Sequence, residues 1–320
     1  LEKHLKKNDI AIANIAKKLN DTENALASTQ QQISDLEKQK QQLTAKKIQQ
    51  ENLLAKQLQA AYTSGNHDYL KLLLNQEDPS KIQRSISYYQ YLNQARIAEI
   101  ENFKTTISKL LEVVTLQQEK SEQLTQLQAT QTAQQNNLKL SKAQQAKTIK
   151  QLNKQLLSSK DQLAKLVAAE ENLLIEIQRL AKLAKKSLEL KGLSKLKRKL
   201  KWPVRGKLKH RFGTKKQGYL KWKGVLLTAP VGRQVKSIHN GKVLFSNWLK
   251  GYGLVTVIDH GEGYMSLYGH NQALLKSVGD TVEAGEPIAL IGQSGGQSEP
   301  GLYFEIRYKG KAINPKTWCR

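Results

Sequence analysis

Residues 5 to about 61 contain neither glycine nor proline, and this helix-favouring stretch restricts the fold more than any other feature. Its apolar residues recur at intervals of seven, beginning with Ile12 and Leu19, and a second series that includes Ile15 is offset by three. The pattern predicts the a/d seam of a coiled coil, with polar breaks such as Lys40. A helix of about 60 residues would be roughly 90 Å long, which is too long for a globular core.

A second helix-favouring stretch predicts the return arm of an antiparallel hairpin. A Ser-Gly-Asn sequence breaks the helical pattern near residue 65, and Pro79 favours a helix that starts just after it. Helical sequence then continues to about residue 185, which is longer than the first arm can cover. Either the return arm overhangs its partner, or another turn interrupts it. We assign residues 1–185 to the hairpin, with a small lobe at its tip near residues 63–95.

The tip lobe is richer in leucine and tyrosine than a simple reversal of the chain requires. Apolar patches that contain tyrosine mark partner sites on protein surfaces. The lobe is therefore a small core that holds the tip together, a docking surface, or both. The candidate docking residues are Tyr69, Leu73, Tyr89 and Leu92.

The formal net charge is +25, and its simplest interpretation is a solvated helical surface rich in lysine. A charge of this sign attracts anionic polymers or a membrane surface. We expect no nucleic-acid partner, since no RRM or paired zinc-finger motif is present. The single cysteine, Cys319, excludes an intramolecular disulfide, and no apolar run is long enough to span a bilayer. Because the sequence begins at Leu1, we expect that any signal peptide has been removed or lies outside it.

Residues 186–201 connect the hairpin to the last part of the chain and carry a basic run. The simplest interpretation of this segment is a linker. Leu188, Leu190 and Leu193 make it more apolar than linkers usually are. It is therefore also a candidate amphipathic segment that lies on a groove.

From residue 202 onward the apolar period changes to two, and turns that contain glycine separate short predicted strands. Evenly spaced strands of this kind predict an all-β sandwich or barrel over residues 202–320. In the strand predicted for residues 301–307, even-numbered residues share one face and odd-numbered residues the other. The expected fold is thus a long helical coiled-coil hairpin followed by an all-β domain.

Several short motifs of this last part occur in the order typical of LytM/lysostaphin-type zinc peptidases. They include Trp-Pro-Val-Arg-Gly at residues 202–206, Ile-Asp-His-Gly at 258–261 and Gly-Glu-Pro-Ile at 285–288. The chain resembles that family from residue 202 to its end. A two-armed coiled coil ahead of such a domain is similar to the murein hydrolase activators, and this second resemblance spans essentially the entire chain.

The first resemblance implies a zinc site, but its ligands are missing from this sequence. In the family, a His-x-x-x-Asp motif and the last histidine of His-Leu-His bind the metal. The matching residues here are Trp222, Leu226 and Tyr303, and the first histidine of His-Leu-His is replaced by Gly301. Tryptophan and leucine have no donor atom for zinc, and a phenol with a pKa of about 10 is a poor ligand at neutral pH. Only His270 matches an active-site histidine of the family, and packing is the simpler explanation for it. We therefore expect no metal, no cofactor and no enzymatic activity.

The groove of the peptidase site is expected to remain. Former ligand positions face into it, and residues two apart on a strand share a face. The predicted groove residues are Trp222, Lys223, Leu226, Tyr252, Val255, Tyr268, Tyr303 and Arg307. Aromatic residues and arginine anchor protein interfaces, so a groove for a partner helix is a better prediction than a catalytic slot. The alternative is that these aromatic rings only plug the vacated cavity.

The second resemblance implies a role at the cell wall. Activators of this kind are periplasmic proteins that switch on N-acetylmuramoyl-L-alanine amidases, which cleave peptidoglycan at the division septum. The resemblance implies amidase binding in the groove and docking of the coiled coil on the periplasmic loop of FtsX, a subunit of the membrane complex FtsEX. FtsX would be the only link to the inner membrane. It also implies autoinhibition by an arm over the groove, formed either by the segment with Leu188, Leu190 and Leu193 or by the apolar helix before it.

Two other functions stay open at this point. A zinc endopeptidase of peptidoglycan with altered ligands would contain stoichiometric zinc and would act alone. A basic scaffold would bind peptidoglycan or nucleic acid through charge, and its binding would be sensitive to salt.

Overall fold

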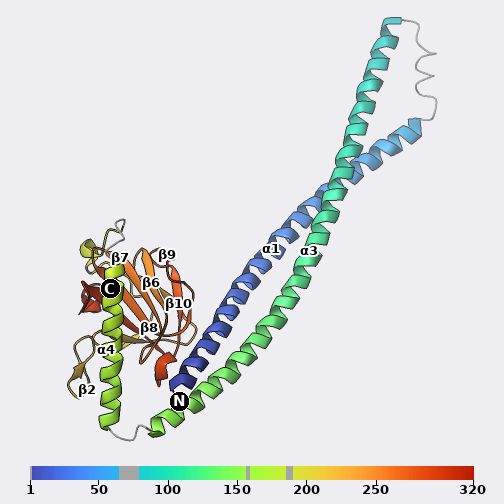
Figure 1. Ribbon diagram of the computed structural model, residues 1–320. Coiled ribbons are helices and arrows are strands. Elements are labelled where there is room, and N and C mark those ends of the chain that lie inside the picture. Colours follow the sequence, from blue (N-terminus) through green and yellow to red (C-terminus); the bar gives the residue numbers. More distant parts are fainter. Residues whose placement is uncertain (1, 65–78, 156–158, 185–189) are drawn as a thin grey trace. The chain divides into compact units, whose positions relative to one another are not determined.

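The computed structural model of this protein describes residues 2–64, 79–155, 159–184 and 190–320 (Figure 1). They form two compact units, which we call the coil unit and the domain unit. The coil unit comprises Thr22–Thr130, and the domain unit comprises Leu1–Asp21 together with Gln131–Arg320. None of the described helices combines the length and the apolar character needed to cross a membrane.

The coil unit is an antiparallel pair of long helices. They are the parts of α1 (Glu2–Ser64) and α3 (Pro79–Gln155) that lie within Thr22–Thr130, while the rest of both helices belongs to the domain unit. The α1 seam repeats every seven residues through Thr22, Thr29 and Leu36, all of which are buried. Across the pair, Gln117 Nε2 donates a hydrogen bond of 2.6 Å to the Glu37 carboxylate. The predicted heptad register is therefore confirmed, with threonine at two seam positions.

The return arm is interrupted, which was one of the two alternatives for its excess length. α3 ends at Gln155, and a separate helix, α4 (Ser159–Ala184), belongs to the domain unit. Asp161 in the first turn of α4 and Lys182 in its last turn both match the sign of the helix macrodipole. The apolar helix expected before residue 186 is therefore α4.

The last part of the chain folds into antiparallel strands, as predicted. Within residues 190–320, ten strands make one sheet: β1 (Lys207–His210), β4 (Val225–Thr228), β5 (Gln234–Lys236), β6 (Gly241–Leu249), β7 (Gly253–Gly261), β8 (Tyr264–Leu274), β9 (Thr281–Val282), β10 (Pro287–Ile291), β11 (Gly301–Tyr308) and β12 (Lys311–Ile313). Their order is β1-β4-β11-β8-β7-β6-β9, while β10 pairs with β5 and β8, and β12 pairs with β11. A separate small sheet consists of β2 (Lys215–Gln217) and β3 (Leu220–Lys221).

The two faces of the main sheet are buried against different partners. On β11, Leu302, Phe304 and Ile306 share one face, as predicted, and all three are fully buried in one hydrophobic core. Tyr303 lies on the opposite face, in a second core that includes α4. Figure 1 shows α4 running along the sheet on this side. The strict alternation of β11 thus separates a structural core from a helix-covered face.

The base of the hairpin packs on another part of the same domain unit. Ile12 of α1 and Leu138 of α3 share a small apolar cluster with Ala273 and Leu290 of the sheet. The contact is polar as well, because the buried Asp9 carboxylate accepts hydrogen bonds from three other elements. The first turns of α1 are therefore part of the domain's packing.

Candidate functional site

The positions that match the zinc ligands of the peptidases come together on neighbouring strands. Leu226 of β4 lies directly opposite Tyr303 of β11 in the strand register. The Trp222 ring lies 6.0 Å from the Tyr303 ring, centroid to centroid, and stacks on the His210 ring at 4.5 Å. The predicted meeting of these three residues is confirmed, and His210 is an addition to it.

These residues do not fit a zinc ion. Neither the Trp222 indole nor the Leu226 side chain offers a lone pair to a cation. The Tyr303 hydroxyl donates a hydrogen bond to Glu305, and burial together with the Glu305 charge raises the pKa of Tyr303 well above its ordinary value. In the described part of the chain, no group of three or more His, Cys, Asp or Glu residues could hold a metal ion.

A cluster of aromatic rings forms the floor beside Tyr303. Its ring lies 5.2 Å from that of Tyr252 and 6.1 Å from that of His270. His270 Nδ1 donates a hydrogen bond of 2.9 Å to the Ser294 carbonyl, and burial lowers the pKa of the imidazole to about 4. His270 is therefore neutral at physiological pH and acts as a packed ring with one fixed hydrogen bond.

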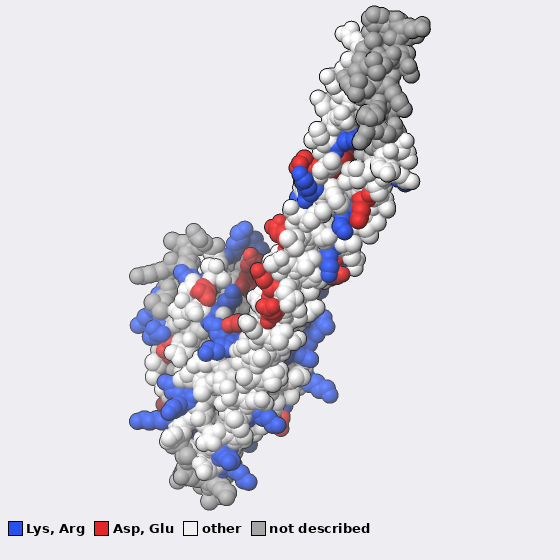
Figure 2. All heavy atoms as spheres, turned by 90° about the vertical axis from the view of Figure 1, so that its right-hand side faces the viewer, with Lys and Arg blue, Asp and Glu red and all other residues white. Residues whose placement is uncertain are grey.

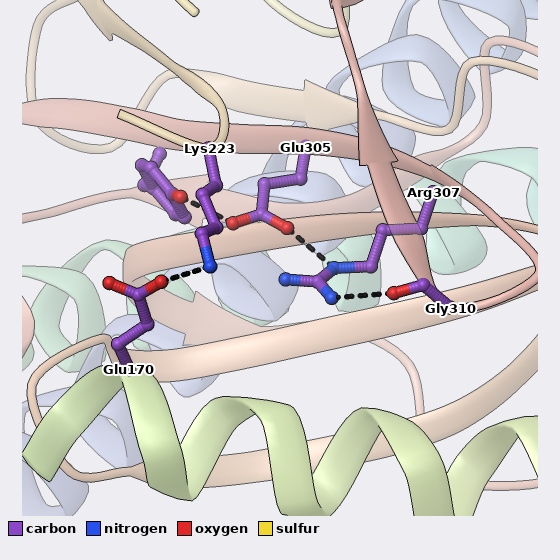
Figure 3. Close-up of polar contacts among 6 residues, drawn as sticks. Glu170, Lys223, Glu305, Arg307 and Gly310 are labelled. Carbon is purple, nitrogen blue, oxygen red and sulfur yellow. Dashed lines mark hydrogen bonds and ion pairs between the residues drawn. The ribbon is translucent and has the colours of Figure 1, made fainter. Parts of the chain in front are cut away.

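The polar part of the floor is a buried ion pair on β11 (Figure 3). Arg307 Nε donates a hydrogen bond of 2.6 Å to Glu305, and Arg307 Nη1 donates one of 3.0 Å to the Gly310 carbonyl. Both side chains are almost completely buried, at 2% and 0% exposure. Arg307 was predicted to edge the groove, but the structure places its charge within the floor, where Glu305 neutralises it.

Helix α4 fills the groove above this floor. Leu173, Ile177 and Leu180 of α4 are at most 2% exposed and pack on the face that carries Leu226 and Tyr303. Their spacing of four and three residues places them on one side of a helix. The structure thus selects the second of the two candidate arms, the apolar helix, as the segment that covers the groove.

Polar contacts flank the buried side of α4. The Glu170 carboxylate forms an ion pair with the Lys223 ammonium group, as Figure 3 shows. Gln217 Nε2 donates a hydrogen bond of 3.2 Å to Gln162. Lys216 of β2, which the sequence did not single out, lies with its ammonium nitrogen 4.8 Å from the centre of the Trp222 ring. The small β2–β3 sheet therefore contributes one wall of the site.

The backbone of the loop before β7 approaches α4 closely. Gly251 has a φ angle of +80°, and a Cβ atom built on it would lie 2.4 Å from the Cβ of Ala169. Only glycine fits both this conformation and this distance. The loop therefore depends on glycine for the close docking of α4.

One predicted groove residue lies on the wrong side of the sheet. Tyr268 is fully buried in the other core, where its hydroxyl accepts a hydrogen bond of 3.1 Å from the Ile238 backbone N–H. In the strand register Tyr268 lies opposite Phe304, and the two share a face. Its neighbour Leu267 faces α4 instead. The prediction was wrong because it placed this residue without knowing the pleat of β8, whereas Val255 of β7 does lie beneath α4.

Two of the other predicted arm residues, Leu190 and Leu193, are described, and they lie outside the groove. Leu193 is fully buried, but in the core on the opposite face of the sheet. Leu190 is partly buried, and its carbonyl lies close to Gly261. Leu188 lies outside the described residues. The segment from residue 190 onward therefore packs as part of the domain.

The tip candidates are only partly described. Tyr69 and Leu73 lie outside the described residues, while Tyr89 is partly buried. Leu92 is 49% exposed, and its neighbour Tyr91 is 72% exposed. Their role as a docking surface stays a prediction.

Comparisons with known proteins agree with this architecture. Residues 220–315 match the model of peptidase family M23. The murein hydrolase activator EnvC of Escherichia coli (strain K12) is 38% identical over 98% of this chain and 83% of its own length. The murein hydrolase activator NlpD of the same strain is 39% identical over 36% of this chain and 29% of NlpD. A solved zinc containing peptidase from Vibrio cholerae is 26% identical, with a TM-score of 0.35, over 37% of this chain and 39% of that one. On the similarity that extends over almost its entire length, the chain belongs to the family of the murein hydrolase activator EnvC.

Proposed function

We propose that this protein is a non-catalytic activator of N-acetylmuramoyl-L-alanine amidases in the periplasm, and that it works at the division septum. The observation that carries the proposal is an apolar helix, α4, seated in a groove whose former ligand positions are Trp222, Leu226 and Tyr303. A groove whose former ligand positions do not fit zinc, and which holds a helix, is suited to a partner helix. The names of its relatives EnvC and NlpD, both murein hydrolase activators, support the same role.

The contacts of α4 describe the kind of amidase segment that would replace it. Glu170 pairs with Lys223, and Leu173, Ile177 and Leu180 follow it on the same side of the helix. A partner helix with one acidic residue, and with apolar residues three, seven and ten positions later, would regain each of these contacts. The groove therefore binds either α4 or such a helix.

Exchange of the two helices is energetically feasible. The Glu170–Lys223 pair is partly exposed, at 18% and 43%, and such pairs contribute about 0–1 kcal/mol. Most of the stabilisation comes from fully buried apolar side chains, at roughly 1.5–3 kcal/mol each. An incoming helix buries equivalent side chains, so the net cost of displacing α4 is small. A further partner needs only a modest preference for the open state to shift the equilibrium.

We assign that further partner to the periplasmic loop of FtsX, which would bind the tip of the hairpin. Tyr88 and Tyr91 at the start of α3 are 71% and 72% exposed, and tyrosine is enriched in the buried centre of protein interfaces. Replacing both by serine should abolish stimulation by FtsX and leave the basal activation of the amidase unchanged. If FtsX still stimulated the double variant, the tip of the hairpin would not be its docking surface.

Two isoleucines of α4 provide a matched test of the autoinhibition. Ile177 is 1% exposed and faces the groove, whereas Ile175 is 65% exposed on the same helix. With a cognate amidase and dye-labelled sacculi, Ile177→Glu should raise dye release at least fivefold over the wild type. Ile175→Glu should change it by less than twofold. Equal effects of the two variants would reject α4 as the inhibitory helix.

The groove itself is tested by Leu226→Glu, which places a carboxylate among apolar side chains. This change should abolish both amidase binding and activation, while circular dichroism shows the fold retained. Dye release by this protein alone, without an amidase, would overturn the non-catalytic assignment.

A further inference from the structure

A second hollow of the domain shares no residue with the groove under α4. It has a volume of about 1340 Å³ and lies between residues 196–206, the β5 region and the last turn of the chain. Seven of its lining residues are basic, namely Lys199, Lys201, Arg205, Arg233, Lys236, Lys316 and Arg320. Its lining includes no Asp or Glu.

The charges around this hollow are segregated rather than mixed. The adjoining hollow beside β9 is lined by Glu283 and Glu286 and by no lysine or arginine. Elsewhere in the domain, Lys209, Lys223 and Lys276 each pair with a glutamate. Within residues 190–320, by contrast, no ion pair neutralises any of the seven cations of the basic hollow. Their positive field is therefore available to a ligand.

The concave shape of the hollow and the Trp202 ring in its lining indicate which class of anionic ligand it fits. Arg233 Nη1 donates a hydrogen bond of 2.7 Å to the Arg205 carbonyl, which holds the guanidinium at the rim. Trp202 lines the hollow and is only partly buried, with its ring edge-on to Phe304 at 6.4 Å. A concave basic surface with one aromatic ring fits a chain of sugars that carries acidic groups better than it fits a flat membrane.

We propose that this hollow binds the stem-peptide carboxylates of peptidoglycan, and so holds the activator on the substrate of its amidase. The inference rests on the proposed function, which brings the protein to the cell wall. It adds a second binding surface to that function. The groove binds the amidase, and the basic hollow binds peptidoglycan. Simultaneous binding would raise the local concentration of amidase at its substrate.

Co-sedimentation of the full chain with purified sacculi, in the absence of amidase, tests the proposal. The triple variant Lys199→Gln, Lys201→Gln, Lys236→Gln removes three cations of the hollow. The control Lys17→Gln, Lys242→Gln, Lys311→Gln removes three exposed lysines that do not line it. We expect the first variant to bind at least fivefold more weakly and the control to stay within twofold of the wild type. Binding by the wild type should also decline as salt increases.

Two further binding measurements identify the ligand. Sacculi whose carboxylates have been converted to amides should bind the wild type at least fivefold more weakly. Anionic lipid vesicles and duplex DNA should not bind better than unmodified sacculi. Equal binding by the two triple variants, binding unaffected by amidation, or a preference for vesicles or DNA would each overturn the proposal. A failure here is distinguishable from failure of the proposed function, because binding of the amidase in solution is measured separately.

Discussion

Asp9 and His270 bind the two sides of one peptide unit. The Asp9 carboxylate at the start of α1 accepts a hydrogen bond of 2.8 Å from the Gly295 N–H, and His270 Nδ1 donates one of 2.9 Å to the Ser294 carbonyl. The Ser294–Gly295 peptide thus lies between the base of the hairpin and the aromatic floor of the groove. The His270 ring in turn lies 6.1 Å from the Tyr303 ring. A structural change at the base of the hairpin can therefore reach the groove through the Ser294–Gly295 peptide and the His270 ring.

Asp9→Asn should loosen this connection. The carboxylate also accepts hydrogen bonds of 2.5 Å from Gln145 and 2.8 Å from the Trp248 indole, so every neighbour is a donor. An amide brings its own donors into this buried site and leaves at least one group unsatisfied, which costs about 1–3 kcal/mol. Thermal unfolding and hydrogen exchange of the first turns of α1 measure the loss. Asn8→Ala, which removes one hydrogen bond of 3.3 Å to Thr148, should cost clearly less, and a larger effect there would contradict the role of Asp9.

Acidification should destabilise the domain between pH 6.5 and 4. Burial lowers the pKa of His270 and of His260 to about 4 in the folded protein. The unfolded chain therefore binds these protons first, and the free energy of unfolding decreases as the pH falls from about 6.5 to about 4. A shift of this size corresponds to roughly 3 kcal/mol for each histidine. Below the folded pKa, this contribution no longer changes with pH.

Replacement of one histidine isolates its share of the pH effect. His270 has a φ angle of +62°, and asparagine tolerates that conformation better than most residues do. His270→Asn should reduce the slope of unfolding free energy against pH by about half, because His260 still titrates. Urea unfolding at several pH values measures the slope. An unchanged slope would show that folding does not lower the pKa of His270.

The Glu305–Arg307 pair should be stabilising only as a pair. Arg307→Met leaves a fully buried carboxylate without its main partner and should cost about 3–5 kcal/mol. The double variant Glu305→Gln, Arg307→Met removes both charges and should lose less than the sum of the single variants. A double-mutant cycle by urea unfolding measures the difference. Additive losses would show that the two side chains act independently.

The sequence predicted those parts of the site that follow from local periodicity. Alternation on β11 placed Tyr303 opposite to Leu302, and the spacing of Leu173, Ile177 and Leu180 required a partner for α4. Tyr268 was misplaced because its side of the sheet depends on how β8 pairs with β11, which composition does not encode. Pairing across the sheet is thus where single-sequence reasoning failed.

Contacts between distant segments were also beyond prediction. Asp9 is one carboxylate on a lysine-rich helix, and nothing local distinguishes it from a solvated residue. Its burial depends on Trp248 and Gly295, which lie more than 200 positions away in the chain. Lys216 was missed for the same reason, since its place over Trp222 depends on how the β2–β3 sheet folds back.

Gly251→Ala should open the groove without removing any apolar side chain of α4. The added Cβ atom would lie 2.4 Å from Ala169 Cβ, so the helix or the loop has to move by more than 1 Å to reach ordinary contact. Gly251 also has a φ angle of +80°, where alanine costs about 1–2 kcal/mol in itself.

Gly232→Ala is the matched control, because its φ angle is +84° and nothing lies within 4 Å of its Cβ position. The melting temperature should fall for both variants, since both carry the same backbone strain, and it should fall further for Gly251→Ala, which also disturbs the packing of α4. Only Gly251→Ala should raise amidase activation severalfold in the dye-release assay, because only there does the methyl group meet α4. Equal activation by both variants would mean that backbone strain in the domain, and not the docking of α4, limits access to the groove.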